Sequence, residues 1–198
     1  MSEQQTRFEL AIALFDAANA DDPNQQEEQP KELLYAKRMS EMLNRFVPDA
    51  SEAVKLAVRA QHIKRWTVPR GSYPMTKDGY YAWRTGLYKF HAETAGDLMR
   101  QAGYDEDMIG RVKAAVGKRG LKVNPETQLL EDVTDLVFIE YYMLAFAGSK
   151  PDYDEEKWLG IVRKTWNKMS EAAHKFALSG AVKLPEPLVP LIVKAIGA

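Results

Sequence analysis

The sequence predicts an all-α fold, and three observations support this class. Apolar residues recur at spacings of three and four along most of the chain, which is the period of an amphipathic helix. No segment alternates apolar and polar residues as a half-buried strand does. Neither a βαβ pattern nor a glycine-rich phosphate loop is present. We therefore expect a single compact domain of about seven helices over residues 1–198, a length that can bury a substantial core.

Turn-forming residues divide the first half of the chain into four predicted helices. The first covers residues 8–20 and stops at the sequence DDPN. The second begins after Pro30 and ends before Pro48, because proline cannot continue a helix. A capping position at Asp49 or Ser51 then starts a third helix. The third and fourth helices cover residues 53–66 and 78–102, and a loop rich in proline and glycine separates them.

A clear signal marks the start of the helix predicted over residues 125–147. Asn124 and Pro125 occupy a capping position and the first helical position, where proline is favoured. Residues 136–146 are apolar on nearly every side, which predicts a helix surrounded by other helices. The predicted elements of this half are helices over residues 105–116, 125–147 and 154–178, followed by a C-terminal tail over residues 180–198.

Composition excludes several classes of protein. The chain has no cysteine, which rules out disulfide scaffolds, thiol nucleophiles and cysteine-ligated metals. Any transition-metal site must use the three histidines and carboxylates. The first ten residues lack the basic and apolar regions of a signal peptide, and no apolar run approaches the roughly 20 residues needed to cross a bilayer. We expect a soluble, cytoplasmic protein that does not associate with membranes.

Basic residues are concentrated in one part of an almost neutral chain. The net charge is −1, yet residues 59–91 hold seven basic residues against Asp78 alone, a local charge of +6. Guanidinium groups match phosphate oxygens and aromatic faces stack on bases, so this segment favours an anionic ligand. Solvated helix faces with core aromatics are the alternative. The candidate substrate-binding residues are Arg59, Arg65, Arg70, Arg84, Trp66 and Trp83.

Two histidines and an acidic pair are the candidate reactive groups. His91 lies on the apolar face of its predicted helix, and His62 lies in the preceding helix. Glu131 and Asp132 come just before the apolar part of a third helix. In one interpretation His91 is a hydrogen-bonded core residue and the acids pair with basic side chains. In the other, both histidines and one or both acids bind a divalent cation.

Four strings resemble a bacterial and fungal family of a domain of unknown function, whose members are often labelled glutamyl-tRNA synthetase-like. They are RAQHIKRWTVPRGSYP at 59–74, GYYAWRTGLYKFHAETAGDLMRQAGY at 79–104, QLLEDVTDLVFIEYY at 128–142 and KTWNKMS at 164–170. The chain has neither the nucleotide-binding α/β fold nor the HIGH-type element of a class I synthetase. Its KMS at 168–170 is only a fragment of the KMSKS loop, and we expect it inside an amphipathic helix.

The chain also resembles, more distantly, the HD-domain superfamily of all-helical, metal-dependent phosphohydrolases. This resemblance implies an HD-like fold in which His62 and His91 are metal ligands and Asp132, or its neighbour Glu131, is the final acid. Ala92 stands where the superfamily has the aspartate of its His-Asp pair. An alternative alignment takes His91 as the first histidine and leaves no His-Asp pair further along the chain.

These patterns lead to a hydrolase hypothesis. A divalent metal on His62, His91 and Asp132 would acidify a bound water, and Glu131 or Asp132 would orient that water or act as general base. The arginines would bind a small, phosphate-bearing, nucleotide-like substrate. The alternatives are a non-catalytic nucleotide- or RNA-binding protein and a structural partner protein. The near-neutral charge makes RNA the less favoured ligand. Substrate, metal identity and oligomeric state stay open.

Overall fold

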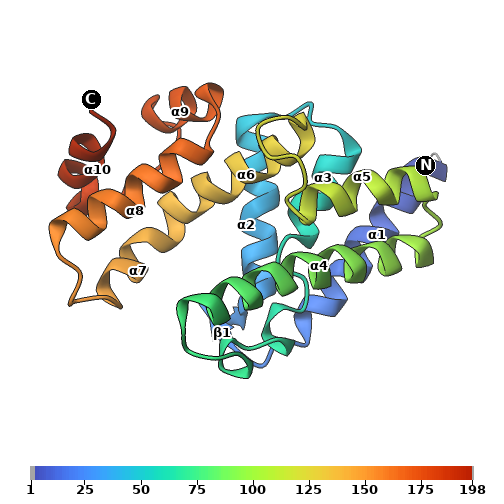
Figure 1. The fold of residues 1–198 in the computed structure, drawn as a ribbon. Coiled ribbons are helices and arrows are strands. Elements are labelled where there is room, and N and C mark those ends of the chain that lie inside the picture. The colour runs from blue at the N-terminus through green and yellow to red at the C-terminus, as the bar shows by residue number, and fades with distance from the viewer. Residues whose placement is uncertain (1–2, 198) are drawn as a thin grey trace. The chain divides into compact units, whose positions relative to one another are not determined.

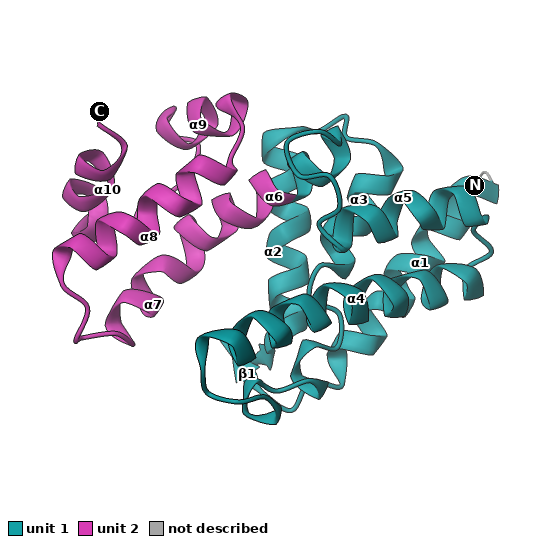
Figure 2. Ribbon diagram, viewed as in Figure 1, with its two compact units in different colours: residues 1–130 teal, residues 131–198 magenta. Residues whose placement is uncertain are grey.

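A computed structural model of the protein describes residues 3–197. The all-helical class is confirmed, but the expected number of helices was wrong, because this range contains ten α-helices (Figure 1). Two compact units divide the chain, unit 1 over Met1–Leu130 and unit 2 over Glu131–Ala198 (Figure 2). The single domain over residues 1–198 stays a prediction.

Helices packed around a common core form unit 1. Its elements are α1 (Glu3–Ala20), α2 (Lys31–Phe46), α3 (Glu52–Ala60), α4 (Lys77–Gln101), α5 (Glu106–Val116) and the start of α6 (Pro125–Val137). Helix α5 packs on both α3 and α4, and α2 packs on α3 (Figure 1). Phe15, Met39, Leu56, Leu87 and Ile109 are fully buried between them. This core fixes the ends of α2 and α3 and the middle of α4, where the candidate site lies.

A short hairpin precedes α2 and was not predicted. It consists of β1 (Gln25–Gln26) and β2 (Gln29–Pro30), joined through Glu27 and Glu28 in left-handed backbone conformation. Such a turn ordinarily favours Asn or Gly, so the sequence carries no usual hairpin signal. The carboxylate of Asp22 accepts hydrogen bonds from the backbone N–H groups of Asn24 and Glu32. Asp22, which precedes the hairpin, thereby fixes the first turn of α2.

The predicted third helix ends earlier than expected, at Ala60 rather than residue 66. Lys64 interrupts it with a left-handed backbone (φ 52°), and its N–H donates to the side chain of Asn19 in α1. Two 3-10 turns follow, at Arg65–Thr67 and Arg70–Ser72. The Arg70 guanidinium donates to three backbone carbonyls, those of Tyr73, Pro74 and Thr76. One side chain therefore organises the loop that leads into α4.

Gly79 tests how tightly this loop packs on the first turn of α4. A Cβ atom there would lie 2.1 Å from the carbonyl oxygen of Pro74. We expect Gly79→Ala to lower the free energy of unfolding by about 2 kcal/mol, because the loop or the helix start must shift. Urea denaturation measures this. The matched control is Gly110→Ala in α5, where nothing lies within 4 Å and a gain of about 0.5–1 kcal/mol is expected. Equal stability of Gly79→Ala and wild type would contradict the packing.

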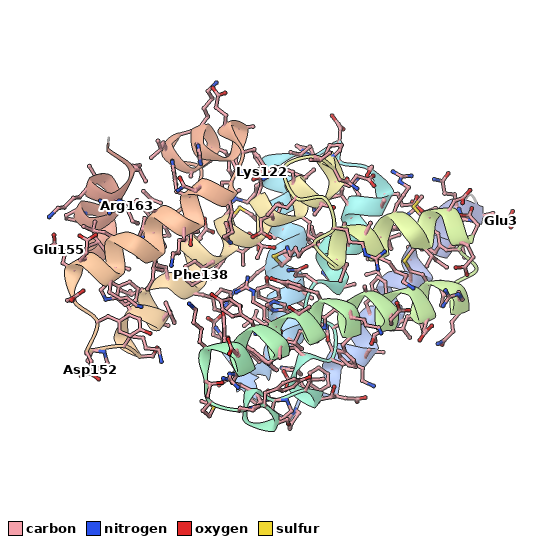
Figure 3. The ribbon with its side chains drawn as sticks, viewed as in Figure 1. Glu3, Lys122, Phe138, Asp152, Glu155 and Arg163 are labelled. Carbon is pink, nitrogen blue, oxygen red and sulfur yellow. The ribbon has the colours of Figure 1, made fainter. Side chains whose placement is uncertain are left out.

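Unit 2 contains the rest of α6, a π-helical turn over Phe138–Tyr142, α7 (Met143–Gly148), α8 (Glu155–Lys168), α9 (Glu171–Leu178) and α10 (Val189–Ile196). Figure 3 labels Phe138, where the π-helical turn begins. The expectation that residues 136–146 are buried on every side was wrong, since 49% of Leu144 is exposed. The predicted tail over residues 180–198 includes α10, which packs on α8.

The long helix predicted over residues 154–178 is two helices. Met169 has an extended backbone (ψ 155°) and ends α8, and the Ser170 hydroxyl caps α9 by accepting from the N–H of Ala173. Lys168, Met169 and Ser170 therefore lie at a turn, and not inside an amphipathic helix as expected. The buried acid Asp132 accepts from both the N–H and the hydroxyl of Ser170. This pairing with a residue of α6 favours the break over a continuous helix.

Candidate functional site

Unit 1 brings together His62 and His91, the two histidines that the sequence analysis selected. Their ring centroids are 5.9 Å apart with the planes tilted by 38°. His62 comes from the turn after α3, and His91 comes from the middle of α4. The ring of Tyr35 in α2 stacks on His62, with centroids 4.1 Å apart and planes 12° from parallel. Three elements thus hold a pair of imidazoles in a defined arrangement.

His91 is a buried, neutral imidazole with one nitrogen left over. Only 2% of the residue is exposed, and burial lowers its pKa to about 3, with the neighbouring His62 adding to the effect. Its Nδ1 lies 2.9 Å from the carbonyl oxygen of Ile63. A carbonyl only accepts, so the ring proton is on Nδ1 and Nε2 carries a lone pair. That Nε2 atom is buried and has no hydrogen-bond partner among the described residues.

His62 has the same tautomer, for a different reason. Its Nε2 lies 3.3 Å from Nη1 of Arg65, and a guanidinium group only donates. The proton of the neutral ring is therefore on Nδ1. Burial pulls the pKa of His62 well below its usual range, and the charges of Arg65 and Lys118 lower it further, although 23% of the side chain is exposed. Both histidines consequently present Nε2 as a lone pair.

Glu32 completes this group, and the sequence analysis missed it. Its Oε2 atom lies 3.4 Å from Nδ1 of His62, and only 9% of its side chain is exposed. Burial raises the pKa of Glu32 to about 7, against the opposing charges of Arg65 and Lys31. The sequence held one signal: Glu32 is three residues before the apolar Tyr35, on the buried face of α2. An acid on a buried stripe needs a reason to be there.

Two of the four selected arginines have roles within the fold. Arg59 forms a two-pronged ion pair with Asp16, with both N···O distances 2.7 Å. Arg70 donates to the loop carbonyls described above. The other two lie closer to the histidines. Arg65 contacts His62, and Arg84 donates to the hydroxyls of Tyr80 and Tyr88, neutral groups that leave its charge uncancelled.

The two selected tryptophans lie in different elements, Trp66 in a 3-10 turn and Trp83 in α4. Trp66 is half-buried within that turn. Trp83 donates its indole N–H to the carbonyl of Val68 at 2.9 Å. The guanidinium of Arg65 lies 4.9 Å from the centre of the Trp83 ring. Arg65 is therefore oriented by a cation–π contact as well as by His62, and one face of Trp83 is covered.

The selected acids Glu131 and Asp132 lie in unit 2, where local partners hold them. Lys168 donates to Glu131 at 2.8 Å and to Asp135 at 2.7 Å, while Asp132 accepts from Ser170. The acids are nearly buried, so these partners match the pairing alternative, with Lys168 in place of a cation from residues 59–91. Within residues 3–197, no group of three or more His, Asp or Glu side chains is arranged to hold a metal ion.

Comparison with known proteins identifies a family whose function is unknown. A family model described as "Domain of unknown function (DUF4202)" matches residues 9–192. No significant match was found among curated proteins or among solved structures. In the described part of the chain, no helix combines the length and the apolar character needed to span a membrane. The site itself is therefore the source of any functional conclusion.

Proposed function

Since the chain belongs to the family described as "Domain of unknown function (DUF4202)", we propose its function from the site: a metal-dependent hydrolase of a small, phosphate-bearing, nucleotide-like molecule. One observation carries the proposal. Two neutral imidazoles have ring centroids 5.9 Å apart, each with its proton on Nδ1 and a lone pair on Nε2.

This arrangement suits metal ligands. A histidine that binds a metal nearly always donates its other N–H to a carboxylate or a backbone carbonyl, which sets the tautomer. The Ile63 carbonyl takes that position for His91, and the Glu32 carboxylate lies 3.4 Å from Nδ1 of His62. A lowered pKa keeps both rings neutral, as a ligand must be. A bound cation would also satisfy the buried Nε2 of His91.

The remaining chemistry follows from the cations nearby. A bound divalent metal would lower the pKa of its water and so supply hydroxide near neutral pH. Arg65 would give up His62 Nε2 when the cation binds, and would then be available to a substrate phosphate. Arg84 and Lys118, whose charges also lower the pKa of His62, add positive potential for the same anion.

The distant HD-domain resemblance supports the same proposal, including an HD-like fold. The HD pattern and this proposal both place metal-binding histidines on neighbouring elements of a helical core. The proposal for this chain uses His62 and His91 of unit 1, and the alanine at position 92 implies that its ligand set differs from the HD pattern.

A non-catalytic nucleotide- or RNA-binding protein is the second candidate, and one surface feature favours it. Tyr80 and Tyr81 are exposed at the start of α4, beside the exposed Arg84. Exposed rings next to guanidinium groups are typical of stacking surfaces for bases. Binding without turnover, weakening steeply as salt rises, would favour this candidate.

Titration calorimetry with zinc, manganese and cobalt, together with phosphate release from a panel of nucleotides, tests the hydrolase proposal. His62→Ala and His91→Ala should each weaken metal binding by at least about 100-fold and abolish turnover. His174→Ala is the matched control, because this third histidine lies in α9 of unit 2, stacked on Trp166. Unchanged metal binding in both variants, or turnover that survives chelation, would overturn the proposal.

A further inference from the structure

We infer that Glu32 is a positioning residue, whose carboxylate lies 3.4 Å from Nδ1 of His62, favours the proton on that nitrogen and so holds the His62 lone pair on Nε2. The consequence for catalysis rests on the proposed function. The tautomer itself does not depend on that function, because it follows from contacts within unit 1. Glu32 belongs to none of the sequence patterns considered above.

Hydrogen bonds fix the backbone at Glu32, from which the side chain extends to His62. Its N–H donates to Asp22 at 3.1 Å, and the same Asp22 carboxylate accepts from the N–H of Asn24 at 2.9 Å. These contacts tie the first turn of α2 to the segment between α1 and the hairpin. A rigid base of this kind is what a side chain needs in order to orient another group.

Helix α2 holds the imidazole of His62 from two directions. Glu32 approaches its Nδ1 edge at 3.4 Å, and Tyr35, one helical turn further on, stacks on its face at 4.1 Å. Arg65 lies at the opposite edge, 3.3 Å from Nε2. A carboxylate near Nδ1 and a donor at Nε2 favour the same tautomer, so the contacts on both edges agree.

A purely structural role explains Glu32 poorly. The carboxylate is almost fully buried, and its closest contact to a ring is to His62, a neutral group. Burying a carboxylate beside a neutral group costs stability, although the charges of Arg65 and Lys31 partly favour it. Sites that act on ligands retain such groups at the expense of stability, whereas a core position would be filled better by an apolar side chain.

Nitrogen-15 NMR of the histidine rings at pH 8.5 tests the inference without any metal or substrate. Arg65→Ala removes the competing contact at Nε2, and His62 should keep its proton on Nδ1 in that variant. In Glu32→Leu/Arg65→Ala the ring should change mainly to the Nε2–H form. Glu32→Gln/Arg65→Ala should restore the Nδ1–H form, because the amide oxygen can still accept. Glu41→Leu/Arg65→Ala, altering an exposed acid of the same helix, should match Arg65→Ala.

Metal affinity supplies an independent second measurement. Glu32→Leu should weaken zinc binding by about 10- to 100-fold, and Glu32→Gln by less than about 10-fold. A ring that stays in the Nδ1–H form in Glu32→Leu/Arg65→Ala, or leaves it in Arg65→Ala alone, overturns the inference. If the wild type does not bind zinc but the variants show the expected tautomer changes, the proposed function is overturned. The role of Glu32 is then still supported.

Discussion

Lys168→Met is expected to destabilise the protein by about 2 kcal/mol at pH 7 in urea unfolding. Lys168 contacts both Glu131 and Asp135, whose side chains are only 6% and 5% exposed. Burial alone would lower the pKa of Lys168, but these carboxylates raise it overall, which shows how strongly they favour its charge. Removing one partner of a buried ion pair costs about 3–5 kcal/mol, and the 35% exposure of Lys168 reduces this value through solvent screening.

The effect of Lys168→Met should depend on pH in one direction. The pKa of Lys168 is raised above 10.5 in the folded protein, so the stability that its charge contributes is fully present below pH 10.5 and is lost as pH rises through the folded-state value. The cost of Lys168→Met should therefore stay constant between pH 7 and about 10 and become smaller above that range. Adding Glu131→Gln and Asp135→Asn should restore most of the loss at pH 7. Lys175→Met, which breaks an exposed pair with Glu171, should cost under about 0.5 kcal/mol, and an equal cost for Lys168→Met would refute the account.

Glu32→Gln should have the opposite effect and stabilise the metal-free protein by about 3 kcal/mol at pH 8. The folded-state pKa of Glu32 is raised to about 7 from an ordinary value of 4.5, and each unit corresponds to about 1.4 kcal/mol. A raised carboxyl pKa means that stability is fully present below pH 4.5 and is lost as pH rises to about 7. The amide cannot ionise, so the variant avoids this loss.

Unfolding of wild type and Glu32→Gln at pH 4 and pH 8, with chelator present, separates this effect from a packing change. The two proteins should differ little at pH 4. The folded-state pKa of His91 is about 3, below its ordinary value of 6.5, so the protein also loses stability as pH falls below 6.5. That loss is common to both proteins and cancels in the comparison. Glu41→Gln, on the exposed face of α2, should match the wild type throughout, and a gain for Glu32→Gln that is equal at both pH values would contradict the titration argument.

Helix starts could be predicted because a cap uses residues within one turn. Ser51, one of two expected capping residues, accepts from the N–H of Val54 at the start of α3. Pro125 is the first residue of α6, as the sequence predicts. Spacing and capping also give the all-helical class correctly.

Helix ends set by distant residues could not be predicted in this way. Lys64 adopts a left-handed conformation that Asn19, 45 residues earlier, fixes through a hydrogen bond. The break at Met169 depends in the same manner on Asp132, which binds Ser170 from another helix. Windows of ten to twenty residues contain neither partner, and so they predict helices that are too long and too few.

The residues of the candidate site also fall into those that the sequence could identify and those that it could not. His62 and His91 could be selected because they are scarce titratable groups at inward positions. Charge counting located Arg65, but it could not show that Arg59 is neutralised by Asp16. Glu32 escaped notice because an acid in the first turn of a helix is ordinarily explained by the helix dipole.

The peptide group between Ile63 and Lys64 connects two hydrogen bonds that were described separately. Its carbonyl accepts from His91 Nδ1, and its N–H donates to the side-chain oxygen of Asn19. An amide is one resonance unit, so a hydrogen bond at either end increases polarisation at the other. Electron density at the far nitrogen of the His91 ring is therefore tuned by an asparagine in α1. The basicity of the His91 imidazole thus depends on two hydrogen bonds that join three segments of the chain.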